Sequence, residues 1–162
     1  KYQREVRRKI ITHFTLQNNI NDISSIMVLM NMVVDIERIG DYSKNILDLA
    51  IHYPDKLNTK TLHPELYEIE QVVKTRFDKT VDAIKTEDIE LASKLIKGFK
   101  KQVTTASDRI VNNIISGEIN IESGSESAAI VLYARYLKRI GSHLKNITTT
   151  VINPIDSIGY QS

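Results

Sequence analysis

The chain of 162 residues has no cysteine and no tryptophan, and it has only six glycines and three prolines. The absence of cysteine excludes disulfides, thiolate zinc sites and thiol nucleophiles. No run approaches the about 20 apolar residues that a membrane-spanning helix needs, and no apolar core follows the basic N-terminus as it would in a secretion signal. We therefore expect a soluble, cytoplasmic protein without direct membrane insertion.

Charge is nearly balanced, with 22 basic and 20 acidic residues and a net charge of +2. Because the two signs alternate along the chain, the sequence gives no electrostatic reason to expect nucleic acid as a partner. The only basic cluster is interpreted as a solvated helix face; it consists of Arg4, Arg7, Arg8 and Lys9.

Apolar residues recur at spacings of three and four almost throughout, which predicts an all-α protein. A long helix is expected from Asp22 to just before Tyr53, with Asn21 or Asp22 as its N-cap. It should stop there because Pro54 disfavours helical geometry in the residue before it.

Three further helices are predicted. The first opens at Pro64, because proline suits the first helical position. Thr86 is expected to cap the next one, which should run to a C-cap at Gly117. The last is predicted to start near Ser125 and to end before Pro154.

The chain contains an internal repeat. The ten residues from Glu37 to Ile46 match those from Lys138 to Ile147 at six positions. We predict one helical domain over residues 1–153, with an incomplete first repeat in 1–55, a three-helix second repeat in 60–153 and a tail in 154–162. The first repeat is expected to lack its N-terminal helix. Its uncovered apolar surface then favours association, and a homo-oligomer is expected.

The most informative polar residues are Glu37 and Asp41, which project from one face of the long helix one turn apart. They lie within about a quarter-turn of Val34 and Met30, so we expect them to interrupt the apolar stripe. Buried carboxylates need a cation, and their oxygens suit hard metal ions. The alternatives are an intramolecular salt bridge and a hydrated helix edge.

The second copy replaces these carboxylates with Lys138 and Ser142. A lysine there repels a metal ion, so we expect its ammonium to act as a built-in cation paired with Asp78, Asp82 or Asp108. A competing interpretation is an anion site formed by three basic residues: Arg135, Lys138 and Arg139.

Two segments resemble the signature helices of the PhoU family: Asp35 to Asp41 followed by Lys44-Asn45-Ile46, and Ala134 to Gly141. The resemblance implies a pair of three-helix bundles, with iron, zinc, manganese or magnesium held by Glu37 and Asp41. It further implies a cytoplasmic regulator that connects the phosphate ABC transporter to a sensor histidine kinase, without catalysis. The departures at Lys138 and Ser142 leave the second metal site of the family open.

The sequence is also compatible with functions other than a metal-binding regulator. A cytosolic PhoU-like domain of a sodium-phosphate cotransporter and a metal-independent helical interaction module both remain open. A di-iron enzyme would need paired Glu-x-x-His elements, which are absent, so we do not expect an enzyme. Gly40 and Gly141 are costly in a helix and therefore predict close helix contact in both copies. The histidines are interpreted as surface or core residues without a site: His13, His52, His63 and His143.

Overall fold

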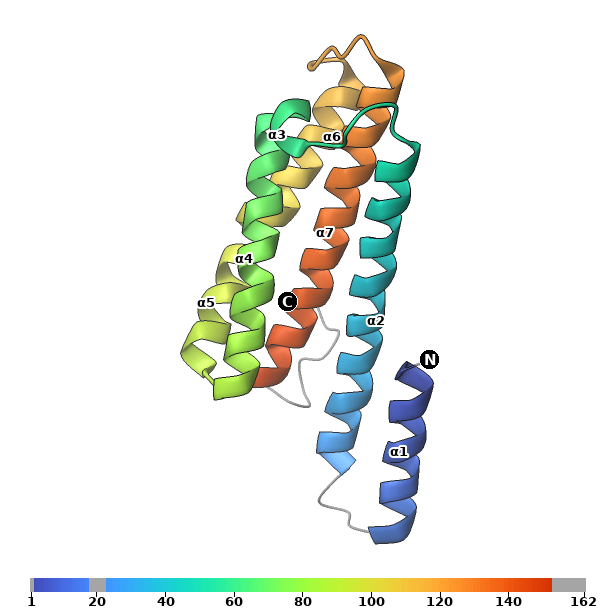
Figure 1. Ribbon diagram of the computed structural model, residues 1–162. Helices are drawn as coiled ribbons and strands as arrows, with labels where there is room; N and C mark the ends of the chain where they lie inside the picture. The colour runs from blue at the N-terminus through green and yellow to red at the C-terminus, as the bar shows by residue number, and fades with distance from the viewer. Residues whose placement is uncertain (1, 18–22, 153–162) are drawn as a thin grey trace.

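The computed structural model describes residues 2–17 and 23–152, and every regular element in these two ranges is a helix (Figure 1). The predicted all-α class is confirmed. The predicted caps Asn21 and Asp22, and the predicted tail in 154–162, lie outside the described residues. None of the described helices is both long enough and apolar enough to cross a membrane.

Helix α7 (Gly124–Ile152) packs against most of the other helices, and α4 (Pro64–Thr86) runs along it. These two helices are the first two rods of a bundle. The third rod is built from α5 (Ile89–Phe99), a π-helical segment (Lys100–Thr105) and α6 (Ala106–Ser116). The three rods enclose one apolar core because each carries apolar residues at helical spacing. Its most deeply buried members include Leu66, Ile69, Val103, Ile110 and Ile130.

Helix α2 (Ile23–His52) lies along another side of α7, and α1 (Tyr2–Gln17) packs beside the N-terminal part of α2 (Figure 1). Five residues of α2 point towards α7 and the core: Asp35, Ile39, Tyr42, Ile46 and Leu49. The described chain thus combines a three-rod bundle with a helix pair. That these two units are repeats, with the boundaries given above, stays a prediction.

Most helix ends agree with the sequence. Pro64 is the first residue of α4, α2 ends at His52, and Gly117 closes α6 with a φ of 79° in the left-handed region that favours glycine. The predicted start near Ser125 falls one residue after Gly124, where α7 begins. The basic residues Arg4, Arg7, Arg8 and Lys9 are all exposed on α1, as predicted.

Three details of the helix assignment differ from the prediction. The cap of α5 is Asp88, whose side chain accepts from the Leu91 amide at 2.9 Å, whereas Thr86 is the last residue of α4. The rod from α5 to α6 has a π-helical interruption, which apolar spacing does not reveal. Helix α3 (Thr59–Leu62) was not predicted because four residues are too few to show a period.

Tyr133 of α7 gives this core a pH dependence. Burial, with a smaller contribution from the charge of Glu70, raises the pKa of its phenol to about 12. In the unfolded chain the phenol titrates near pH 10, so above that pH the unfolded state loses a proton that the folded state keeps. The stability that this group contributes is complete below about pH 10 and is lost as the pH rises towards 12, by roughly 1 kcal/mol at pH 11.

Urea unfolding of the parent and of Tyr133→Phe at about pH 8 and about pH 11 checks this expectation. Lysines and other tyrosines titrate in both proteins, so the difference between the two isolates Tyr133. The parent should lose more stability than the variant between the two pH values. Equal losses would show that Tyr133 titrates alike in the folded and unfolded states.

Candidate functional site

The predicted metal ligands Glu37 and Asp41 lie near the middle of α2. Both side chains are exposed. The Asp41 carboxylate accepts a hydrogen bond from Nη1 of Arg38 at 3.3 Å, and 54% of its side chain remains accessible. The expectation that these carboxylates interrupt a buried apolar stripe is therefore wrong.

The geometry of α2 explains the difference. Each residue advances about 100°, so Glu37 and Asp41 point about 200° and 240° away from Asp35, which faces α7. Met30 and Val34 share the side of Glu37 and are half-buried. Towards the C-terminal end of α2, no described element covers the side that faces away from α7. Leu47 and Ile51 are accordingly 64% and 74% exposed.

The oxygen atoms of the pair are the type of ligand that a hard cation prefers, but two carboxylates alone supply too few ligands. Glu37 and Asp41 offer oxygen ligands one turn apart, and Mg²⁺ or Mn²⁺ prefers such oxygens. However, no group of three or more histidine, cysteine, aspartate or glutamate residues gathers for a metal within the described ranges. Arg38 also neutralises Asp41. An ion bound here would need further ligands from water or from another chain.

In the second copy an ammonium group, that of Lys138, stands where the first copy has the Glu37 carboxylate. Nζ of Lys138 donates to both oxygens of Asp108, at 2.7 and 2.6 Å, and Nη1 of Arg135 lies 3.5 Å from the same carboxylate. The predicted pairing of Lys138 with an acidic residue of this bundle is thus confirmed for Asp108, whereas Asp78 and Asp82 are exposed on α4. Two of the three residues of the competing anion site, Lys138 and Arg135, already contact the Asp108 carboxylate as their anion.

A buried polar cluster joins α2 to α7. Asp35 is only 9% exposed, and its Oδ1 accepts from Nδ1 of His143 at 2.7 Å and from Nδ2 of Asn146 at 3.1 Å. The ring of Tyr42 stacks on His143, with centroids 5.9 Å apart, and lies 6.1 Å from the ring of Tyr136. The cluster fixes how the two helices sit against each other.

This cluster was not predicted. The period of three and four along α2 does place Asp35 in line with Ile39, Tyr42 and Ile46, and that alignment was the available signal. His143 was interpreted as a residue without a site, although it is the partner of Asp35. A buried arginine on α4, Arg76, was missed too, since nothing near it in sequence marks it as buried.

Comparison with known proteins finds a matching family and several related proteins. The PhoU domain family matches residues 1–50 and 66–151. A relative from Pseudomonas putida, called phosphate-specific transport system accessory protein PhoU homolog, is 27% identical over 135 residues, which are 82% of this chain and 52% of the relative. The homolog from Clostridium acetobutylicum is 25% identical over 160 residues, 93% of this chain and 69% of the relative. A Thermotoga maritima protein, PhoU homolog 1, is 27% identical over 157 residues, 92% of this chain and 65% of the relative.

The chain therefore spans about half of the length of the Pseudomonas putida relative. No solved structure matches it. Both helices that carry the repeated motif, α2 and α7, lie almost wholly within the matched residues.

Proposed function

Because the chain belongs to the PhoU family, we propose that it is a regulatory accessory protein of phosphate transport and phosphate signalling. The observation that carries this proposal is the family match over both motif-bearing helices, supported by relatives that are named as phosphate-transport accessory proteins. The protein would act by binding partners. Those partners are a phosphate ABC transporter and a sensor histidine kinase, as the resemblance implies.

We place the regulatory contact on the uncovered side of α2. This surface combines the carboxylates of Glu37 and Asp41 with exposed Leu47 and Ile51. The carboxylates would hold one ion of iron, zinc, manganese or magnesium, and a bound ion would cancel their charge and offer free coordination positions to an acidic group of the partner. Their exposure supports this arrangement, because ligands from a second chain can reach them.

The same exposure favours a second candidate function, a metal-independent interaction module. Exposed carboxylates need no cation, since water solvates them, and Arg38 already partners Asp41. In that case the side of α2 would bind its partner through apolar contacts alone. The cytosolic domain of a sodium-phosphate cotransporter is a third possibility for the chain, and it would share the same surface.

Titration with Mn²⁺, followed by calorimetry, separates the first two candidates. The parent should bind the ion, and Glu37→Gln/Asp41→Asn should bind it at least about 10-fold more weakly. Asp78→Asn/Asp82→Asn is the matched control, because it removes an equally spaced exposed carboxylate pair from α4. Equal affinity in all three proteins would refute the metal site.

The regulatory role is tested in the host cell. Deleting the gene should uncouple phosphate uptake from the external phosphate concentration, and the parent gene should restore the coupling. Uptake that still follows external phosphate after deletion would refute the role. Restoration by the Glu37→Gln/Asp41→Asn gene would favour the metal-independent module.

A further inference from the structure

Arg76 of α4 is a buried cation that has no anionic partner among the described residues. It is only 7% exposed, and its guanidinium lies over the ring of Phe99 at 5.6 Å. Nη1 donates to the backbone oxygen of Leu95, and Nη2 donates to Oε1 of Gln102 at 2.8 Å. Nε is buried and has no hydrogen-bond partner, and no carboxylate of the described residues pairs with the group.

Such an arrangement is costly by itself. Removing a charged group from water costs several kcal/mol unless an opposite charge repays it, and here only neutral oxygens and an aromatic face are present. These two hydrogen bonds use two of the five N–H groups of the guanidinium. Arginine stays protonated at neutral pH even when buried, so the charge persists and an anion would stabilise it.

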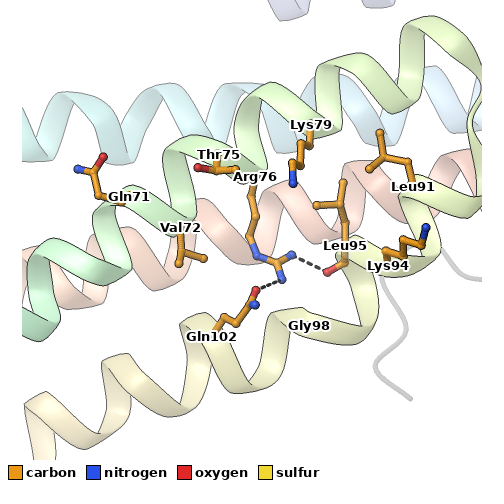
Figure 2. A pocket seen from close by; sticks show the side chains of 10 residues that line it. All are labelled: Gln71, Val72, Thr75, Arg76, Lys79, Leu91, Lys94, Leu95, Gly98 and Gln102. Carbon is orange, nitrogen blue, oxygen red and sulfur yellow. Dashed lines mark hydrogen bonds between the residues drawn. The ribbon is translucent and has the colours of Figure 1, made fainter.

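A cavity of about 400 Å³ opens beside Arg76, between α4 and the rod that carries α5 (Figure 2). Two more cationic side chains line it, Lys79 from α4 and Lys94 from α5, and none of its lining residues is acidic. Lys94 pairs with Glu90 at 2.6 Å on the exposed side, whereas Lys79 has no ion pair within the described ranges. The side chains that line the cavity therefore carry only positive charge.

The backbone next to the cavity leaves room for the guanidinium. A Cβ on Gly98 would lie 3.0 Å from Nη2 of Arg76 and 3.1 Å from Oε1 of Gln102. The π-helical segment begins two residues later, at Lys100, and such segments are found frequently at functional sites. A side chain at position 98 would displace the contacts that hold Arg76 at the cavity.

We propose that this cavity binds the phosphate group of a small organic phosphate ester. Three cationic side chains match a dianionic group better than a single carboxylate, and the fork of Arg76 suits phosphate oxygens. The volume exceeds what one phosphate ion fills and lies in the range of small-molecule sites. The apolar walls, from Val72, Leu91 and Leu95, fit the carbon part of an ester. The site is separate from the surface of α2 and does not rest on the proposed metal.

Calorimetric titration with glycerol 3-phosphate, inorganic phosphate and sulfate tests the site. The ester should bind the parent protein, and Lys79→Gln/Lys94→Gln should weaken binding by at least about 10-fold. The control is Lys85→Gln/Lys97→Gln, which removes the same charge from exposed positions of the same two helices outside the cavity. It should keep the parent's affinity within about two-fold.

Arg76→Lys keeps the charge and loses the fork, so it should weaken phosphate binding while circular dichroism reports a folded protein. If that variant does not fold, the lysine pair decides, because both of its residues are exposed. If inorganic phosphate binds as tightly as the ester, the ligand of this site is free phosphate. No binding of either phosphate compound in the millimolar range, or equal loss in the control variant, would overturn the proposal.

Discussion

An Asp35→Ala variant should lose about 2–3 kcal/mol of unfolding free energy, among the largest effects of any single change in this protein. The Asp35 carboxylate is the acceptor for both His143 and Asn146 at the contact between α2 and α7. Alanine would leave two half-buried donors without a partner. The free-energy cost of an unsatisfied buried donor is larger than the net stabilisation that its hydrogen bond contributed. The space that the carboxylate leaves would add to the loss.

Urea unfolding measures this effect, with Asp41→Ala as the control. Asp41 is also an aspartate of α2, but it is exposed, so its removal should change stability by less than about 0.5 kcal/mol. A double-mutant cycle with His143→Ala then isolates the Asp35 to His143 interaction. Similar losses in Asp35→Ala and Asp41→Ala would mean that the cluster does not hold α2 against α7.

The second large effect is expected from Gly141→Val. A Cβ at Gly141 would lie 3.0 Å from Cε2 of Phe99 and 3.1 Å from Cγ1 of Val103, so a branched side chain would force α7 away from the neighbouring rod. Overpacking of this kind costs about 3 kcal/mol at the upper end of the usual range. The prediction of close helix contact at Gly141 is therefore confirmed.

Gly40 occupies the same place in the first motif and provides the control. A Cβ there would meet nothing within 4 Å, so the predicted close contact is wrong for Gly40 among the described residues. Gly40→Val should change stability by less than about 0.5 kcal/mol, because valine is slightly the better helix former. Thermal unfolding of both variants is the measurement. A Gly141→Val protein as stable as the parent would show that α7 has room to move.

The sequence was sufficient for most of the helices. Periodic apolar residues and strong end signals, such as Pro64 and Gly117, act locally, so they can be read without knowing the fold. The sequence predicted that Lys138 pairs with an acidic residue, because a cation on a buried stripe needs an anionic partner. Only the structure selects Asp108 among the three candidates.

The orientation of the candidate site was not predictable in the same way. The same spacing that aligns Glu37 with Met30 also aligns Asp35 with Ile39, and the sequence does not tell which side of α2 is covered. That depends on how α7 and α1 pack against α2, and α1 accompanies only its N-terminal part. Asp35 and His143 are 108 positions apart, and Arg76 meets Gln102 across 26, so no local pattern links either pair.

The second half of α7 packs against neighbouring helices and is at least partly buried throughout. From Ile140 to Ile152 no residue of this helix is exposed, because α2 covers one flank while α4 and α5 cover another. Such a helix has no strip on which substitutions are free, and each change must suit two sets of neighbours at once. During divergence this stretch should therefore change more slowly than α5, whose outer strip is open to water, and α2 and the three-rod bundle are constrained to drift together.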